Sequence, residues 1–170
     1  MIPERYRIHL DARNLHTGAR GYSGEVEIDV KIVEETDYIM LHSKSQVIEE
    51  LKVMNKNGMT EIAVFKHNLF TAADTLTIYF MESLEVNTDV VIHIKYSTEL
   101  LTSGSRFYQT SYVMNGERRY LGTTQFQLSG TRYCFLNFDE PGLKAVFDLK
   151  ITHNASFKAI ANTMETENLK

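Results

Sequence analysis

The chain has 170 residues, which is the size of one ordinary domain and too short for a large multi-domain enzyme. Apolar residues make up 43% and charged residues 24% of it, so the chain can bury a core and is not a disordered polymer. Its 18 basic and 22 acidic residues give a net charge of −4, which argues against a nucleic-acid partner, because a surface that binds phosphates needs excess Lys and Arg.

No apolar run reaches the roughly 20 residues that cross a bilayer, so no membrane segment is expected in this chain. The first residues, 1–7, lack the apolar stretch of a signal peptide. The cellular location stays unassigned at this stage.

Alternation of polar and apolar residues is the main structural signal along the chain. It is clearest over residues 22–32, where Val26, Ile28 and Val30 share one face while Glu25 and Glu27 share the other. A period of two places such sets on opposite sides of a β-strand, one in the core and one in water. The same alternation predicts further strands at residues 6–10, 76–80, 90–96, 147–151 and 157–161.

One segment is ambiguous, because Val47, Leu51 and Met54 have spacing that also suits a short helix. Its β-branched residues and the following Asn57-Gly58 turn favour a strand. Asn57-Gly58 and Asn115-Gly116 each accept positive φ angles and predict hairpins. We therefore expect residues 1–170 to form a single all-β domain, an antiparallel β-sandwich or saddle without linker or internal repeat.

Cysteine and histidine patterns give little support for a metal or nucleophilic site. The only cysteine, Cys134, lies in the apolar, strand-like run 133–136, where a buried inert thiol is the commoner interpretation. None of the six histidines stands two, three or four residues from another, and no His-Glu-x-x-His motif occurs. The sequence therefore predicts no zinc site of its own.

Two short polar segments remain as candidates for chemistry. Asp139-Glu140-Pro141-Gly142 forms a turn between apolar segments, and the simpler interpretation is that the side chain of Asp139 caps this turn. Gln125 and Gln127 are two residues apart, so in an extended chain they project from the same face. Their amides suit the binding of a polar or charged group better than acid–base catalysis. From the spacing alone, however, an exposed polar strand face is the simpler explanation of the pair.

The segment around these glutamines resembles the amino-terminal domain of the aminopeptidase N family, zinc metallopeptidases that remove residues from peptide N-termini. The family pattern Thr-Thr-Gln-x-Gln/Glu matches residues 123–127, and Phe-Asp-Glu-Pro followed by Lys-Ala-x-Phe matches residues 138–147. Further matches are residues 3–10, 22–28, 39–43, 151–153 and 159–164, so that the resemblance covers nearly the whole chain.

This resemblance implies a saddle-shaped β-domain that lies against a thermolysin-like catalytic domain. It implies that Gln127 reaches the free amino end of a peptide and that Gln125 helps to line the S1 pocket. The family's Gly-Ala-Met-Glu-Asn loop and zinc-binding His-Glu-x-x-His helix follow later in its members, and neither is present here. We therefore expect a substrate-recognition domain without catalytic residues, metal ligands or peptidase activity of its own.

Departures from the family pattern support a second hypothesis. Leu136-Asn137 replaces the family's Pro-Cys, and residues 162–165 diverge where further strands are expected, so the sheet is predicted to lack its last strand or strands. The alternative is thus a truncated, non-catalytic paralogue that acts as a binding module, for example on a full-length relative. A lipocalin-like barrel is disfavoured because the chain has no Trp.

A last motif concerns modification. Asn154-Ala155-Ser156 fits the acceptor triplet for N-glycosylation, which matters only in a secreted context. Family members are cytosolic or membrane-anchored extracellular enzymes, so the resemblance leaves both contexts open.

Overall fold

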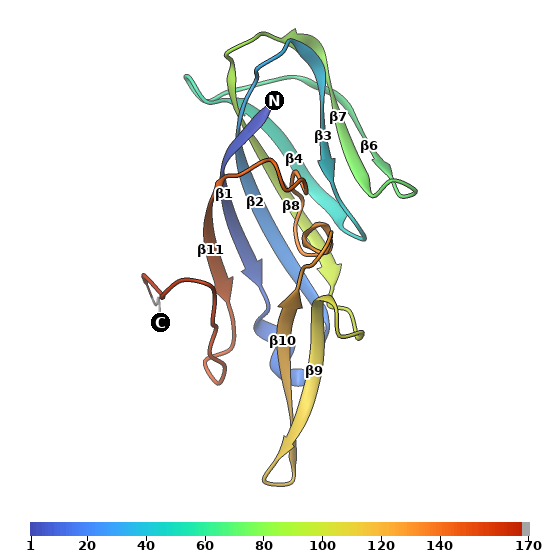
Figure 1. Ribbon diagram of the computed structural model, residues 1–170, viewed down its shortest axis with the longest axis vertical. Coiled ribbons are helices and arrows are strands. Elements are labelled where there is room, and N and C mark those ends of the chain that lie inside the picture. Colours follow the sequence, from blue (N-terminus) through green and yellow to red (C-terminus); the bar gives the residue numbers. More distant parts are fainter. Residues whose placement is uncertain (168–170) are drawn as a thin grey trace.

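The computed structural model describes residues 1–167 and is built almost entirely of β-strands, which confirms the predicted all-β class (Figure 1). In chain order the elements are β1 (Ile2–Asp11), the 3-10 turn η1 (Arg13–Thr17), β2 (Gly21–Lys31), β3 (Thr36–His42), β4 (Val47–Asn55), β5 (Thr60–Glu61), β6 (Val64–Phe70), β7 (Thr75–Leu84), β8 (Asp89–Glu99), β9 (Arg106–Met114), β10 (Glu117–Gln125), η2 (Thr131–Tyr133) and β11 (Val146–Thr152).

These strands form three sheets. The largest has the order β11-β1-β2-β8-β4-β5, the second has the order β3-β7-β6, and β9 pairs with β10 in a two-stranded ribbon. In Figure 1 the three-stranded sheet lies at the upper end of the molecule and the ribbon projects from the lower end. All pairs are antiparallel except β1 with β11, which run parallel with Tyr6 opposite Phe147. Apart from this one parallel pair at the edge, the sheets are antiparallel as predicted.

Alternation along the strands places the core between the large sheet and the layer that covers it. Register aligns Ile8 of β1 with Val26 of β2, and Val26 with Ile94 of β8, so that apolar side chains form continuous rows on one face. The three-stranded sheet contributes Ile39 and Ile78 to the same cluster, and both are fully buried. Burial of these rows on a common face is the main source of stability of the domain.

The opposite face of the large sheet is polar and carries a ladder of ion pairs. Arg7 donates from Nε to Oε2 of Glu27 at 2.6 Å and from Nη2 to Oδ1 of Asp29 at 2.5 Å, and Nζ of Lys56 lies 3.0 Å from Oδ2 of Asp29. Burial alone would raise the pKa of Asp29, whose side chain is only 7% exposed, but the hydrogen bonds from Arg7 and Lys56 outweigh it and lower that pKa.

The ambiguous segment and both predicted hairpins are confirmed. Residues 47–54 lie in β4, and the chain turns after it at Asn57-Gly58 to enter β5. At the tip of the β9–β10 ribbon, Asn115 has φ of 54° and Gly116 has φ of 80°, a left-handed conformation that these two residues tolerate.

Two predicted strands are absent. Residues 157–161 have no strand pairing, and their alternating side chains are largely solvent-exposed. The run 133–136 is not a strand either, because Tyr133 is the last residue of the 3-10 turn η2 and residues 134–136 have no strand pairing. There the carbonyl oxygen of Cys134 accepts hydrogen bonds from the hydroxyls of Tyr22 at 2.9 Å and Tyr96 at 2.8 Å, so side chains take the place of a neighbouring strand.

Strand β11 is formed as predicted but is poorly covered. Phe147 and Leu149 are on the core-facing side, because they align with Tyr6 and Ile8, yet they are 56% and 49% exposed. The ring of Phe147 stacks on that of Tyr6 at 4.7 Å and is otherwise open to solvent. Within residues 1–167, no helix is long and apolar enough to cross a membrane.

Candidate functional site

The two predicted substrate-binding glutamines lie on either side of a strand end. Gln125 is the last residue of β10, opposite Arg106 of β9, and Gln127 is in the turn that follows, at residues 127–130. Both side chains are exposed. The expectation that one extended strand carries both amides is therefore wrong, because strand pairing ends at Gln125 and a turn sets the direction of Gln127.

Close backbone packing shapes this turn. The N–H of Gly130 donates to the carbonyl of Phe126 at 2.8 Å, which closes a loop around Gln127. A Cβ at Gly130 would lie 2.9 Å from Cα and 3.0 Å from the carbonyl oxygen of Phe126. Since both atoms belong to the backbone and cannot rotate away, only glycine allows the loop to close this tightly.

The segment after the turn is anchored to the opposite layer. The carbonyl of Arg132 accepts hydrogen bonds from the N–H of Lys44 at 3.0 Å and from Nε2 of Gln46 at 2.8 Å. The guanidinium group of Arg106 lies over the ring of Tyr133, 4.1 Å from its centroid, which is a cation–π arrangement. These contacts hold the segment that follows the glutamine-bearing turn to the rest of the fold.

Arg132 and Asp139 form a half-buried ion pair after the glutamine-bearing turn. Nε of Arg132 donates to Oδ2 of Asp139 at 2.9 Å, and the two side chains are only 15% and 13% exposed. The N–H of Asp139 donates to Nδ1 of His42, so that imidazole nitrogen must be unprotonated. Burial, followed by the positive charge of Arg132, lowers the pKa of His42 and favours this state. The predicted turn-capping role of Asp139 is therefore wrong: its carboxylate binds Arg132 instead.

Asn137, one of the departures from the family pattern, is at the centre of this cluster. Its backbone exchanges two hydrogen bonds with that of His42, at 2.7 and 3.2 Å, and the residue is 5% exposed. Within residues 1–167, its side-chain Oδ1 is buried without a hydrogen-bond partner. This arrangement fixes the loop by backbone pairing and leaves one buried acceptor unsatisfied.

Cys134 is buried, as the sequence predicted, although not in a strand. Burial raises the pKa of its thiol to about 12, and a hydrogen bond with Tyr22 offsets only part of this. A thiol with such a pKa is protonated at neutral pH and is a poor nucleophile. Its place in the core fits a packing role.

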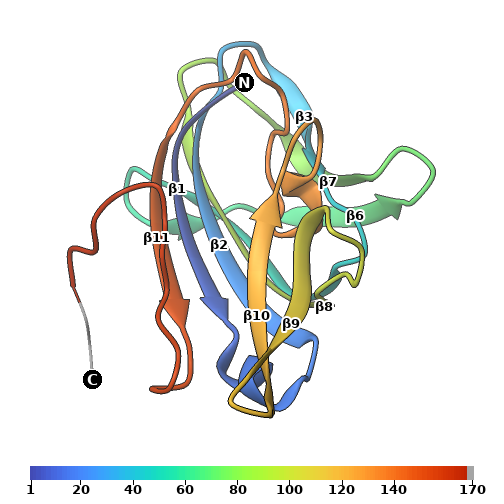
Figure 2. The ribbon, with the colours of Figure 1, turned by 60° about the horizontal axis from the view of Figure 1, so that its bottom comes forward.

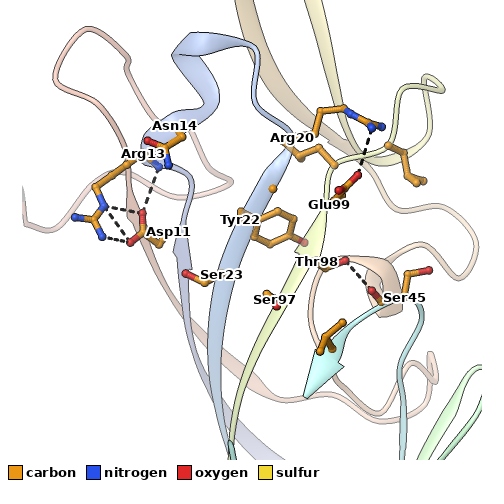
Figure 3. Close-up of a pocket in the computed structure, with 14 residues that line it drawn as sticks. Asp11, Arg13, Asn14, Arg20, Tyr22, Ser23, Ser45, Ser97, Thr98 and Glu99 are labelled. Atoms are coloured by element: carbon orange, nitrogen blue, oxygen red, sulfur yellow. Dashed lines mark hydrogen bonds and ion pairs between the residues drawn. The ribbon is translucent and has the colours of Figure 1, made fainter. Parts of the chain in front are cut away.

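A broad open hollow lies on the large sheet (Figure 3). This open cavity of about 1050 Å³ is on the large sheet, where β1, β2, β4 and β8 approach η1, and neither Gln125 nor Gln127 lines it. Its charged side chains are paired with one another: Arg13 binds Asp11 at 2.9 Å and Arg20 lies 3.3 Å from Glu99. With its charges neutralised in this way, the hollow presents no free acid, base or cation for catalysis.

The described side chains form no metal site. Among residues 1–167, no three His, Cys, Asp or Glu side chains are grouped closely enough to hold a metal ion. The described residues thus offer no ligand set for the zinc ion, whose binding helix the family resemblance places later in the chain of its members.

Comparison with known proteins agrees with the motif. The model of the peptidase M1 N-terminal domain matches residues 2–170. The thyrotropin-releasing hormone-degrading ectoenzyme of Rattus norvegicus is 30% identical over 141 residues, which are 83% of this chain and 13% of that protein. Aminopeptidase N of Canis lupus familiaris is 26% identical over 96% of this chain and 18% of that protein. Aminopeptidase M1 of Arabidopsis thaliana is 28% identical over 95% of this chain and 18% of that protein. The chain thus spans less than a fifth of the length of these relatives.

Proposed function

Since this chain belongs to the peptidase M1 N-terminal domain family, we propose that it is the substrate-facing β-domain of a zinc aminopeptidase and that Gln125 and Gln127 bind the amino-terminal end of a peptide. The observation that carries the proposal is the anchoring of the glutamine-bearing turn. Both amides are exposed, while the backbone around them is held by Gly130, Arg132 and Asp139.

An amide pair of this kind is suited to recognition. The carbonyl oxygen of Gln127 accepts a hydrogen bond from an ammonium group without itself carrying a charge. Such a bond to a charged group contributes about 1.5–3 kcal/mol, which is roughly a 10- to 100-fold change in affinity. A carboxylate in this place would bind the ammonium more strongly.

In this proposal the chain is non-catalytic by itself, and the metal and its ligands come from a following domain. Peptide hydrolysis of this class needs a Lewis-acid metal and an activated water. The relatives that match are several times longer than this chain, which leaves room for such a domain. The exposed Phe147 and Leu149 on the core side of β11 are apolar surface that a following domain would cover.

The test uses the longer protein that contains this chain, with an aminoacyl-arylamide as substrate. Gln127→Ala is expected to raise KM by about 10-fold or more with a smaller effect on kcat, whereas Gln127→Glu is expected to lower KM. Asn57→Ala, which removes an exposed amide in the β4–β5 turn, is the matched control and should leave both constants unchanged. Equal constants for Gln125→Ala, Gln127→Ala and the control would refute the role of the two amides.

The second hypothesis, a binding module that lacks the enzyme, is favoured by the departure at Asn137, whose buried Oδ1 has no partner within residues 1–167. Cross-linking to a full-length family member tests it: capture of that protein by the isolated chain supports the module, and a monomer that captures nothing contradicts it.

A further inference from the structure

The turn that follows β11 contains the single Asn-x-Ser/Thr triplet of the sequence, Asn154-Ala155-Ser156. The strand ends at Thr152, and the N–H of Phe157 then donates to the carbonyl of Asn154 at 2.9 Å, so residues 154–157 form a reverse turn. The triplet is therefore at the end of an edge strand, outside every sheet.

Hydrogen bonds within the turn orient the amide of Asn154. Its Oδ1 accepts from the N–H of Ser156 at 3.0 Å and from the hydroxyl of Ser156 at 2.8 Å. No acceptor among residues 1–167 is hydrogen-bonded to its Nδ2. The oxygen of the amide is thus engaged by the serine of the triplet, and the nitrogen is the atom left for reaction.

The surroundings of the turn have room for a large substituent. Ala155 and Ser156 are exposed, and Asn154 is half-buried beside them. In Figures 1 and 2, β11 and the chain after it lie at one side of the molecule, with β1 and β2 between them and the β9–β10 ribbon. A substituent on this turn therefore stays clear of the strand end that carries Gln125.

We propose that Asn154 is an acceptor for N-linked oligosaccharide. The donor is an oligosaccharide joined to a lipid through a diphosphate, as provided in the secretory pathway. A bond forms between Nδ2 of Asn154 and the anomeric carbon of the first sugar, while the bond from that carbon to the diphosphate oxygen breaks. The lipid diphosphate leaves with the electron pair of that bond, and Nδ2 gives up one proton. The triplet supplies the acceptor sequence, and the turn holds the amide oxygen of Asn154 on Ser156 while its Nδ2 has no hydrogen-bond acceptor among residues 1–167.

The test directs the full 170-residue chain into the secretory pathway of a eukaryotic cell by means of a cleavable leader. The wild-type chain is expected to migrate as a larger species that collapses to the size of the bare polypeptide after treatment with an amidase that releases N-glycans. This treatment converts Asn154 to Asp, which peptide mass spectrometry detects. Asn154→Gln and Ser156→Ala are expected to abolish the larger species, and Ser156→Thr to retain it.

A positive control keeps the result decisive. Glu117→Thr, made in the Asn154→Gln background, completes an acceptor triplet at Asn115 on the exposed tip of the β9–β10 ribbon. If that variant acquires a glycan while wild-type Asn154 does not, the chain has reached the transferase and the proposal is wrong. A glycan that persists in Asn154→Gln would equally overturn it.

Discussion

Replacement of Gly24 by alanine should destabilise the domain, because this glycine of β2 lies directly against a buried ring. A Cβ on Gly24 would be 2.2 Å from Cζ, 2.3 Å from the hydroxyl oxygen and 2.7 Å from Cε1 of Tyr96. Tyr96 is fully buried, and its hydroxyl donates to the carbonyl of Cys134 at 2.8 Å. The ring must therefore move out of its site, and its hydrogen bond must lengthen or break.

The expected cost follows from these contacts. Overpacking of a dense core costs about 1–3 kcal/mol, and the loss of a buried hydrogen bond adds about 1 kcal/mol. The usual gain from replacing glycine by alanine, about 0.4–1 kcal/mol through the unfolded chain, offsets only part of this. We expect a net loss of about 2–3 kcal/mol, or a decrease in Tm of roughly 5–10 °C for a domain of this size.

Thermal and urea unfolding followed by circular dichroism measures this effect. Gly21→Ala is the matched control, because it is in the same strand and a Cβ there meets nothing within 4 Å. It should be neutral or slightly stabilising. Combining Gly24→Ala with Tyr96→Leu should cost less than the sum of the two single changes, since the leucine removes the atoms that clash. Equal stability of Gly24→Ala and the Gly21→Ala control, or simple addition of the two costs in the double variant, would refute the predicted clash.

Two further predictions concern titratable groups. Burial raises the pKa of Cys134 to about 12, so its thiol should not react with a thiol-specific aromatic disulfide at pH 8 in the native chain. The same thiol should react fully in urea. Rapid labelling of the native chain would contradict the burial of Cys134. Because the pKa of Asp29 is lower in the folded chain than its ordinary value of 3.8, the ionised carboxylate stabilises the fold above that value, and this stabilisation is lost as the pH falls through 3.8 towards the folded value. Asp29→Asn should therefore weaken the fall in the free energy of unfolding at acid pH, whereas Asp37→Asn at an exposed position should not. The same acid dependence for both variants would exclude a role of the Arg7–Asp29–Lys56 cluster.

The sequence by itself determined the all-β class, most strands and both hairpins, because these depend on local chemistry. The alternation over residues 22–32 can be satisfied only by a strand with one wet face, and Asn115-Gly116 accepts the positive φ angles that its turn requires. The motif of residues 123–127 likewise identified the family, and the match over residues 2–170 confirmed it.

Only the tertiary structure determined which of the alternating segments pair with a neighbouring strand. Residues 147–151 and 157–161 alternate in the same way, yet only the first segment forms a strand, because β1 offers it a free edge and nothing in the described chain pairs with the second. Pairing is a property of two segments, so alternation in one cannot predict it.

The surroundings of the candidate site depended on the same long-range contacts. Asp139 binds Arg132 and His42 rather than its own turn, and the end of β10 separates Gln125 from Gln127. His42 is 97 residues from Asp139 in sequence. Only the folding of one layer over the other brings such groups within hydrogen-bond distance, and these contacts hold the segment that follows the turn bearing Gln127.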